Sequence, residues 1–559
     1  MLIKITPDKI DFENIPPEKI FSQNQVQVFL NGYFEYNRTI CRDTKAAQKV
    51  LEQYQKSSDT LDFNIFNGCY LGWINDQAQN RFILFNDRFG TYPLFYSTRN
   101  KTLVLSDSFT DIKKQLTSCF YDRLAITEIL CGKYTSGTRT TIREIEAIQP
   151  GSYLDIKFPS DSAPQFKRYW LWEFKPAGKS YSQFADEFVY MIKDMFDDFG
   201  SYIRSTGKPL VVPTSGGYDS RLMISELSHR LTDVSGLIFG APGCDDLQYG
   251  TQIVEGLNLP VKRLFLEPQT YQPIYESPEF AEIISNYNSR GDSHSATITS
   301  LLALDDRRDY IIFPGHSLDM QTGGHIRSRW HYLTPGRDFI VTELFRIHYN
   351  RCPFYSFMRC PAREITEQIR ADIRREMLAD EHTIGFAQRW DMENRQVKFI
   401  INAVREYEVK NFEWMMPGWD YRIQDFFLRL PFKYQFHQNF YLRQLSEKIF
   451  DRRIADINKK AVYDKYGYLI KHLLAKINPA GYLKKSKPAQ KPIYPLVNPQ
   501  YIHLLLNKIE LNRDNPIFEI IDYNSPGFKK YISDISENVD YQYSKVTFYH
   551  LYKHLELHS

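Results

Sequence analysis

The chain has 559 residues, which is too long for one hydrophobic core and predicts two or three folded units. With 43% hydrophobic and 15% aromatic residues, the composition is typical of well-packed globular domains and excludes a disordered chain. The formal net charge is only +3, which argues against a global field that would hold the chain on nucleic acid or on an anionic membrane.

The start of the chain, MLIKITPDK, carries charges where a signal peptide needs an apolar stretch. No later apolar run approaches the roughly 18 residues that span a bilayer, so we expect a cytoplasmic protein without a transmembrane segment. The seven cysteines are scattered and form no CxxC pair. This spacing predicts reduced thiols and argues against a zinc clip or a redox motif.

Short β-rich runs separated by turn residues fill the first part of the chain. The predicted strands lie within 25–36, 66–76, 81–97, 101–107 and 149–158, and one segment, 122–132, has a helical pattern. We therefore predict a mostly β domain over residues 1–175, which ends after the Pro/Ser-rich stretch PSDSAPQ.

Helix, strand and Gly-rich turn alternate after Tyr181, which is typical of a parallel sheet covered by helices. The predicted order is a helix at 181–203, a strand at 209–214, a strand at 234–240, a helix at 247–258 and a strand at 261–267. We assign residues 176–470 to this domain and expect its ligand at the carboxyl ends of the strands. Charged amphipathic helices follow 338, and residues 471–559 read as a basic connector and a helical C-terminal extension.

The run Ser215-Gly216-Gly217-Tyr218-Asp219-Ser220 stands directly between a predicted strand and a predicted helix. Its glycines allow backbone N–H groups to approach phosphate oxygens, its two serines add hydroxyl donors, and the helix adds its positive end. Asp219 is placed to hold the Mg²⁺ that neutralises pyrophosphate. The alternative is an ordinary Gly-rich turn, but this order of strand, loop, acid and helix favours phosphate binding. No Gly-Lys-Ser/Thr follows, which argues against a Walker-type ATPase.

The loop resembles the SGGxDS motif of the ATP pyrophosphatases known as PP-loop enzymes. The run DYIIFPGHSLDMQTGGH is similar to the asparagine synthetase loop GEGxDExxGGY, with Gly315, Asp319, Gly323 and Gly324 in register. FEWMMPGWDYRIQDFFLRLP is similar to VEARVPFLDxxLxxFxxxLP of the same family, with Glu413, Pro417 and Asp420 on the corresponding positions. In the N-terminal half, FLNGYFEYN, FNGCYLGWIND and DRFGTYPLFY are similar to NGEIYN, LxGxFAFxxxD and DRxGxxPLYY.

The resemblance to asparagine synthetase-like proteins implies an N-terminal Ntn-hydrolase-like αββα sandwich, then an α/β parallel-sheet ATP-binding domain with a helical extension. It implies ATP and Mg²⁺ as cofactors and an ATP-dependent ligase that releases AMP and pyrophosphate while it forms an amide. The metal would be held by Asp219 and Asp319. The nucleotide would be held by Ser215, Gly216, Gly217, Asp219, Ser220, Gly240, Gly315 and Ser317.

Candidate catalytic residues follow from the same resemblance. His316 stands where asparagine synthetases have Glu and β-lactam synthetases have Tyr. Because the ordinary pKa of histidine is about 6.5, we expect His316 to accept a proton from the attacking nitrogen. The alternative is a histidine that only forms hydrogen bonds within the loop. Counting forward from YLRQL places Lys459 at the position of the family's lysine, with Lys460 beside it. A lysine there would stabilise the negative charge of the transition state. The alternative is a solvated surface charge. Glu413 is the remaining candidate.

Two departures concern the nitrogen source. Leu2 stands where family glutaminases expose a cysteine nucleophile, and Tyr33 replaces the acidic residue after Asn31-Gly32. We therefore expect an inactive glutaminase domain and nitrogen from ammonia or an amine. The runs SGGYDSR, GAPG and PGWDYRIQDFF look closer to relatives associated with bacterial surface polysaccharides, so aspartate and a sugar uronate are both expected carboxylates. Arg327 and Arg329 would serve an anionic sugar, or belong to a solvated face.

Particular residues bear on three other functions. Gly315-His316-Ser317-Leu318 is similar to the elbow of serine hydrolases, but Asp319 replaces the glycine that the elbow needs. A tRNA sulfurtransferase would need paired cysteines and an RNA-binding appendage, which the sequence lacks. A catalytically degenerate binding or scaffold protein is the alternative from outside the enzymes. Expected partners are small molecules and no nucleic acid, with a homodimer left open.

Overall fold

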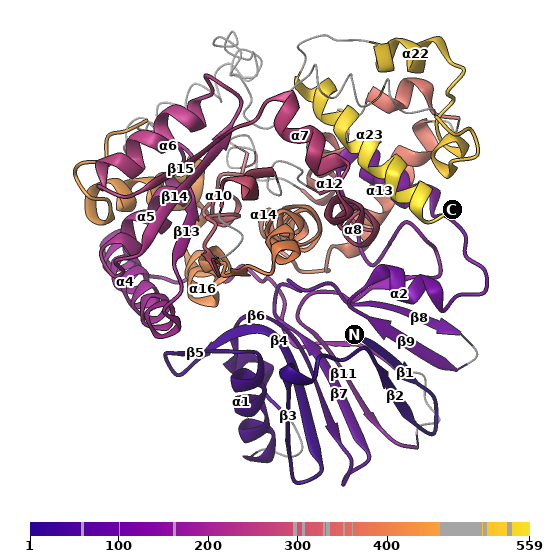
Figure 1. Cartoon of the computed structure of the whole chain (residues 1–559), viewed down its shortest axis with the longest axis horizontal. Helices are drawn as coiled ribbons and strands as arrows, with labels where there is room; N and C mark the ends of the chain where they lie inside the picture. The colour runs from indigo at the N-terminus through magenta and orange to yellow at the C-terminus, as the bar shows by residue number, and fades with distance from the viewer. Residues whose placement is uncertain are drawn as a thin grey trace.

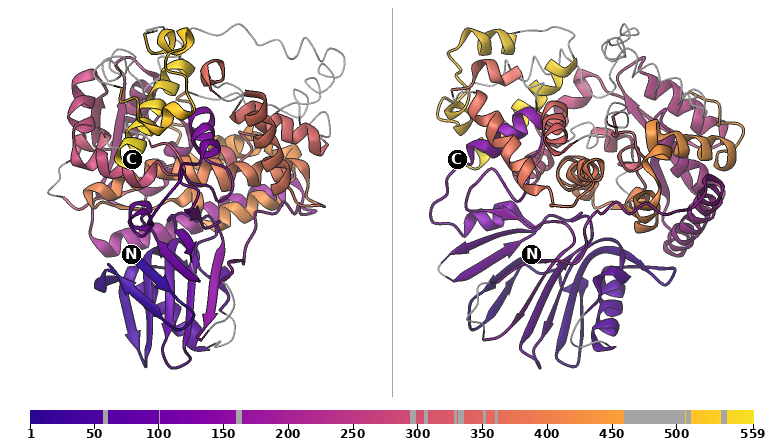
Figure 2. Two further views of the ribbon diagram at one scale, coloured as in Figure 1. Left: turned by 90° about the vertical axis from the view of Figure 1, so that its right-hand side faces the viewer. Right: turned by 180° about the vertical axis from the view of Figure 1, so that it is seen from behind.

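The computed structural model describes residues 1–56, 61–99, 101–159, 164–293, 299–304, 308–327, 330, 336–349, 353–359, 362–458, 506, 511–533 and 539–559. Lys459, Lys460, Arg329 and the predicted basic connector lie outside these residues. The described chain forms three β-sheets, two in its N-terminal part and one in its centre (Figure 1). Figure 2 shows the two N-terminal sheets at one end of the molecule and most helices at the other.

The N-terminal part is a sandwich of two antiparallel sheets with a helix on each outer face. Apolar residues of both sheets, among them Ile3, Phe29 and Trp73, meet in one buried cluster. Helix α1 (Asp43–Lys56) covers the larger sheet, and α2 (Phe109–Lys114) covers the smaller one. The smaller sheet has the order β10-β8-β9-β1-β2, and the larger has β12-β11-β7-β6-β4-β3 with β5 beside β4. The bounds are β1 Leu2–Ile5, β2 Ile10–Glu13, β3 Ile20–Gln23, β4 Val26–Tyr36, β5 Thr39–Arg42, β6 Asn67–Asp76, β7 Arg81–Asn86, β8 Phe95–Arg99, β9 Thr102–Ser106, β10 Glu146–Ala147, β11 Ser152–Lys157 and β12 Lys167–Arg168.

All five β-rich runs predicted for this part contain strands of the two sheets, and the helical pattern at 122–132 is α3 (Arg123–Gly132). Helix α1 was not predicted. Its buried residues Ala46, Ala47, Val50, Leu51 and Tyr54 recur at helical spacing and face the sheet, so the sequence carried a signal that the prediction missed.

The central sheet is parallel and has the order β15-β14-β13-β16-β17. Its strands are β13 Leu210–Pro213, β14 Val234–Gly240, β15 Val261–Phe265, β16 Ile311–Ile312 and β17 Glu413–Trp414, with α4 (Tyr181–Thr206), α5 (Tyr218–Ser228) and α6 (Asp245–Gly256) beside them (Figure 1). The chain runs outward from β13 to β15 and then returns to place β16 on the other side of β13. The gap between the carboxyl ends of β13 and β16 is therefore a topological switch point, where open α/β sheets bind ligands.

Most of the remaining described chain is helical. The principal helices are α8 Pro278–Tyr287, α12 Arg337–His348, α13 Ala362–Glu376, α14 Thr383–Trp390, a π-helix over Asp391–Ile400, α15 Ile401–Arg405, α16 Tyr421–Arg429, α18 Asn439–Gln444, α22 Pro526–Ser533 and α23 Val539–Leu557. The C-terminal helix α23 packs on α3 and α8 in a second apolar cluster (Figure 1). The C-terminal extension thus adds to the folded body.

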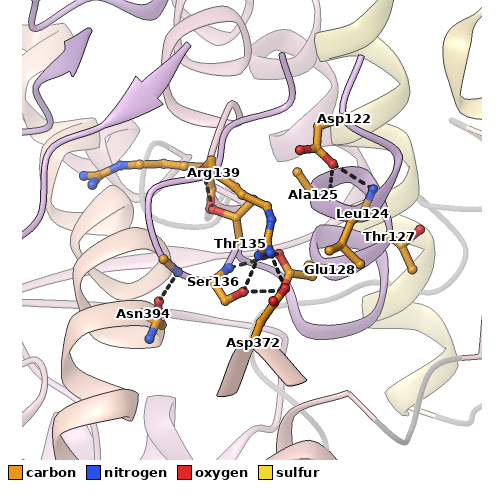
Figure 3. Close-up of polar contacts among 12 residues, drawn as sticks. Asp122, Leu124, Ala125, Thr127, Glu128, Thr135, Ser136, Arg139, Asp372 and Asn394 are labelled. Carbon is orange, nitrogen blue, oxygen red and sulfur yellow. Dashed lines mark hydrogen bonds and ion pairs between the residues drawn. The ribbon is translucent and has the colours of Figure 1, made fainter. Parts of the chain in front are cut away.

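A buried polar cluster ties the loop after α3 to α13 and the π-helix (Figure 3). The carboxylate of Glu128 accepts hydrogen bonds from the N–H (3.0 Å) and the hydroxyl (2.5 Å) of Ser136. Arg139 donates to Ser136 Oγ (2.8 Å) and forms an ion pair with Asp372 of α13. Asn394 Oδ1, on the π-helix, accepts from the N–H of Gly137 (2.9 Å). The N-terminal part is therefore joined to the helices by charge pairs as well as by apolar packing.

The cysteines depart from expectation at one position. Cys41, Cys69, Cys119 and Cys244 are free, but Cys131 is disulfide-bonded, so the prediction of reduced thiols is wrong for this residue. Scattered spacing in the sequence does not reveal which side chains folding brings together. Among the described helices, none combines the length and the apolar character that a membrane crossing requires.

Candidate functional site

The predicted phosphate loop links β13 to α5, whose first turn begins after Gly217. The hydroxyl oxygen of Ser220 accepts from the N–H of Ser215 (3.1 Å), and the hydroxyl of Ser215 accepts from the N–H of Gly217 (3.2 Å). The two hydroxyl oxygens lie 3.2 Å apart. The N–H of Gly216 donates to Asp246 Oδ1, 3.1 Å away at the start of α6. Two hydroxyls and three N–H groups are thus gathered at the carboxyl end of β13.

The second Gly-rich turn packs directly on the first. A Cβ atom added to Gly315 would lie 2.8 Å from the carbonyl carbon of Asp219 and 2.8 Å from the nitrogen of Ser220. Only glycine allows the two backbones to approach this closely. This contact places the loop that carries Asp219 directly beside the loop that carries Asp319.

The two predicted metal ligands, Asp219 and Asp319, act on one tyrosine of α18. The hydroxyl of Tyr441 donates to Asp219 Oδ1 at 2.9 Å. Burial, the charge and hydrogen bond of Asp219 and the charge of Asp319 all raise the pKa of Tyr441 well above its ordinary value. Asp219 therefore contacts this hydroxyl group directly, and Asp319 acts on it through its charge.

His325 connects Asp319 to the helical part of the chain. Its Nε2 lies 3.2 Å from Asp319 Oδ2, and its Nδ1 lies 2.5 Å from Oδ2 of Asp391, the first residue of the π-helix. Burial alone would lower the pKa of His325, but the two carboxylates outweigh it and raise the pKa to about 9. The imidazole is therefore a cation at neutral pH that holds Asp319 in place. Sequence reasoning missed this group because its two acids stand 72 residues apart.

His316 is half-buried, and loss of contact with water lowers its pKa to about 4, with only partial opposition from Asp319. The ring is consequently neutral at pH 7, and its basicity is weaker than the ordinary histidine pKa implies. It remains able to accept a hydrogen bond from an attacking nitrogen.

Arg221 fastens the first turn to the segment that precedes the predicted catalytic lysines. This fully buried side chain donates to the carbonyl oxygens of Gly216 (3.2 Å), Ile454 (3.1 Å) and Ile457 (2.6 Å). The amide of Asn458 donates to the same Gly216 oxygen at 3.3 Å. This described segment of the chain ends at Asn458, and Lys459 and Lys460 lie outside the described residues.

Glu413 does not join the other predicted site residues. It begins β17 and forms an ion pair with Lys208, which precedes β13, and it lies 3.7 Å from Arg42. Since the central strands are parallel, this position is the edge opposite the two Gly-rich turns. Gly240, in contrast, ends β14 at the edge that carries the turns, where its carbonyl accepts from Leu266 (2.8 Å).

Ser317 is buried and adopts a left-handed backbone conformation with φ of 71°. Its hydroxyl donates to Gln396 Oε1 at 2.7 Å. A serine nucleophile needs an accessible hydroxyl beside a base, so this contact argues against the serine hydrolase alternative.

A cavity of about 230 Å³ opens beside His325. Its walls combine charged and apolar side chains of the segment after the second turn, of α12, of α14 and of the π-helix. They include His325, Arg327, Trp330, Leu344, Ile347, His348, Asp391 and Arg395.

The N-terminal sandwich offers no nucleophile at the predicted glutaminase position. Leu2 is buried in the apolar cluster around Phe95 and Phe109. The side-chain oxygen of Asn31 accepts from Lys19 Nζ at 2.5 Å, and the hydroxyl oxygen of Tyr33 accepts from the N–H of Met416 at 2.8 Å. Leu2, Asn31 and Tyr33 thus make structural contacts within the described chain.

Comparison with known proteins gives a domain match and one curated relative. Residues 31–170 match the glutamine amidotransferase domain. The chain is 23% identical over 330 residues to "Putative asparagine synthetase (glutamine-hydrolyzing) 1" of Methanocaldococcus jannaschii, covering 57% of this chain and 55% of the relative. The chain thus spans about half the length of the curated relative that it matches.

Two solved structures were also matched. One is the allosteric regulatory enzyme of purine biosynthesis, at 12% identity and a TM-score of 0.19, covering 54% of this chain and 57% of that chain. The other is glutamine phosphoribosylpyrophosphate amidotransferase from B. subtilis complexed with ADP and GMP, at 10% identity and a TM-score of 0.19, covering 58% and 70%. Scores this low carry no argument about the fold. The domain match and the curated relative support an asparagine synthetase-like protein with an amidotransferase-type domain.

Proposed function

We propose that this protein is an ATP-dependent ligase that adenylates a substrate carboxylate, releases AMP and pyrophosphate, and forms an amide with ammonia or an amine. One observation carries the proposal. Two Gly-rich turns from the adjacent strands β13 and β16 touch at Gly315 and Asp219, and both of their carboxylates act on Tyr441. A switch point with hydroxyls, amides and paired acids is suited to a triphosphate.

The first turn supplies the groups for the leaving pyrophosphate. The hydroxyls of Ser215 and Ser220 and the N–H groups of Gly216 and Gly217 converge at the N-terminus of α5, which favours anions. Asp246 accepts from the N–H of Gly216 and thereby occupies one of these donors. Phosphate binding would exchange this carboxylate contact for a phosphate oxygen.

The residues fit a Mg²⁺ ion that arrives with the nucleotide. Among the residues whose structure is described, no group of three or more His, Cys, Asp or Glu side chains gathers to hold a metal by itself. Mg²⁺ is usually bound by one or two carboxylates together with substrate phosphates, and Asp219 and Asp319 supply that donor set. When bound there, the ion would neutralise charge on the phosphates.

In the proposed reaction an oxygen of the substrate carboxylate attacks the α-phosphorus of ATP. A P–O bond forms to the acyl oxygen, the bond between the α- and β-phosphates breaks, and pyrophosphate leaves toward Ser215 and Ser220. The nitrogen then attacks the acyl carbon, and AMP leaves with the acyl oxygen. Neutral His316 accepts a proton, and Lys459 or Lys460 stabilises negative charge. Glu413 has no part in this scheme because it lies at the other edge of the sheet.

Ammonia or an amine is the proposed nitrogen donor because Leu2 is apolar and buried and Asn31 is bound to Lys19. Aspartate and a sugar uronate, the latter in polysaccharide biosynthesis, are the proposed carboxylates. We also propose a cytoplasmic location. Whether the protein forms a homodimer is left open.

The test is to incubate the purified protein with ATP, Mg²⁺ and candidate carboxylates, and to measure AMP, ADP and exchange of labelled pyrophosphate into ATP. We expect AMP and not ADP, with ammonia as effective as glutamine or better. Asp219→Asn and Asp319→Asn should each abolish exchange. Asp233→Asn, an exposed acid paired with Arg308, is the matched control and should retain it. A chain that binds ATP but forms no AMP with any carboxylate would instead support the degenerate binding protein.

A further inference from the structure

The cavity beside His325 adjoins the proposed adenylation site without being part of the phosphate loop. His325 bonds Asp319 on one side and Asp391, a cavity-lining residue, on the other. The volume of about 230 Å³ equals that of roughly eight water molecules at about 30 Å³ each. This space is below the roughly 300–1,000 Å³ of pockets for drug-sized ligands, so it suits the body of a small acid and not a nucleotide.

Two guanidinium groups, those of Arg327 and Arg395, line this cavity. Arg395 lies 4.0 Å from Asp391, at the outer limit of an ion pair. Guanidinium forks are the groups that proteins use to recognise carboxylates and phosphates, because they present paired N–H donors. The cavity therefore offers recognition of an anion at a place separate from the two Gly-rich turns.

An apolar wall faces these charges. Trp330 is 3% exposed, and its Nε1 donates to Glu343 Oε2 at 3.2 Å, which fixes the plane of the indole. Leu344 and Ile347 of α12 extend this wall. A fixed indole and aliphatic groups give a ring-shaped or short-chain ligand a surface to pack on.

The lining holds one acid, Asp391, and both oxygens of its carboxylate already have hydrogen-bond partners. Its Oδ2 contacts His325 (2.5 Å), and its Oδ1 accepts from the amide of Gln396 (3.2 Å). Among the residues that the structure describes around the cavity, none offers an uncommitted carboxylate to an ammonium group, which the α-amino group of an amino acid would require.

We infer that this cavity receives the part of the acyl substrate distant from the reacting carboxylate, and that this part carries a second anionic group and no ammonium. The inference rests on the proposed ligase function and narrows its substrates. It favours a uronate bearing a phosphate or a second carboxylate over aspartate. Arg327 and Arg395 would bind the second anion, and Trp330 would pack on the body of the acid.

Two matched pairs of acids test the inference through AMP formation. Succinate and aspartate differ only in the ammonium group, and glucuronate 1-phosphate and glucuronate differ only in the added phosphate. We expect succinate to exceed aspartate, and glucuronate 1-phosphate to exceed glucuronate, at least tenfold in kcat/KM. Arg395→Gln should raise the KM of the better acid about ten- to a hundredfold, as loss of a charge-assisted hydrogen bond predicts. Arg363→Gln, on the exposed side of α13, should not change it.

The outcomes separate this inference from the ligase proposal. If aspartate reacts as well as succinate, or if Arg395→Gln leaves every KM unchanged, the inference is wrong. AMP formation in the same assays would still support the ligase proposal. If no acid yields AMP, the ligase proposal fails, and calorimetry with glucuronate 1-phosphate decides the inference alone. If the wild-type chain binds glucuronate 1-phosphate and Arg395→Gln weakens this binding at least tenfold, the inference is supported. If the two proteins bind it equally well, or if the wild type does not bind it, the inference is wrong.

Discussion

At the scale of single residues, Gly315 decides whether the two Gly-rich turns share one site. The position is constrained by backbone, because the atoms nearest to an added Cβ are the carbonyl carbon of Asp219 and the nitrogen of Ser220, each 2.8 Å away. Backbone atoms inside a packed loop cannot move aside as a flexible side chain does. The proposed activity therefore depends on a residue that carries no functional group.

We expect Gly315→Ala to separate the turns and to reduce pyrophosphate exchange at least a hundredfold, while lowering the free energy of unfolding by about 1–3 kcal/mol. Urea denaturation and exchange assays measure the two effects. Gly178→Ala is the matched control, because nothing lies within 4 Å of the Cβ it would add. Full exchange activity in Gly315→Ala would show that contact between the turns is unimportant.

His348 supplies a second prediction at this scale. The residue is half-buried, with Nδ1 2.7 Å from the hydroxyl of Tyr134, and loss of contact with water lowers its pKa from 6.5 to about 3. Between these values the unfolded chain binds a proton that the folded chain does not. The free energy of unfolding should therefore fall as the pH drops from 6.5 toward 3, by up to about 1.4 kcal/mol per pH unit from this residue.

Replacing His348 by Gln should remove that contribution. We expect the loss of stability between pH 7.5 and 5.5, measured by urea denaturation, to be smaller in His348→Gln than in the wild type. His229→Gln, at the end of α5, serves as the control. Identical pH profiles for His348→Gln and the wild type would contradict the assignment.

What the sequence could reveal about the site follows from distance along the chain. Ser215, Asp219 and Ser220 stand in one short loop between a strand and a helix, so their pattern predicts a phosphate site. His325 and Asp391 meet only because α12 to α14 fold back onto the second turn, and no local spacing signals that contact. Glu413 shows the opposite error: it matched a motif, yet the direction of β17 places it at the far edge of the sheet.

At the scale of elements, strong periodicity was predictable and short or irregular elements were not. The strands β4 and β6 and the helix α4 were predicted because they carry long alternating or helical patterns. The two-residue strand β17 and the π-helix Asp391–Ile400 have no comparable signal. Their positions are set by tertiary contacts, which a single sequence does not display.

One such contact joins α5 to the segment 451–458 through Arg221, which donates to the backbone carbonyls of Ile454, Ala455 and Ile457. We expect Arg221→Met to leave these carbonyls without their donor and to lower the free energy of unfolding by about 2–3 kcal/mol. Hydrogen exchange should accelerate over 451–458, and pyrophosphate exchange should fall with it. Arg453→Gln, an exposed residue paired with Asp451, is the control. Unchanged protection of 451–458 would contradict the role of Arg221.

At the scale of the whole molecule, the N-terminal sandwich is attached to the ligase-like part by specific polar contacts. Tyr33 accepts from the N–H of Met416, and Asn67 donates to Asp420 at 3.0 Å, where Asp420 also caps α16. These contacts lie on Met416 and Asp420, which follow the central strand β17. A sandwich without a nucleophile at Leu2 therefore still supports the wall of the proposed site.

The polar cluster of Figure 3 is the second attachment, and Arg139 is its central cation. Removing this charge leaves the fully buried carboxylate of Glu128 without its ion-pair partner, whereas Asp372 keeps its pair with Arg375. Breaking one side of a buried ion pair typically costs about 3–5 kcal/mol. We expect Arg139→Gln to lower the free energy of unfolding by this amount and to loosen the loop between α3 and β10.

A double-mutant cycle separates the charge pair from simple loss of packing. Glu128→Gln combined with Arg139→Gln should be more stable than Arg139→Gln alone, because the buried negative charge is gone together with its partner. Arg143→Gln, an exposed residue on the same loop, should leave stability within about 0.5 kcal/mol of the wild type. Urea denaturation of the four variants measures the coupling. If the effects of the two substitutions simply add, the cluster attaches the sandwich through its shape and not through its charges.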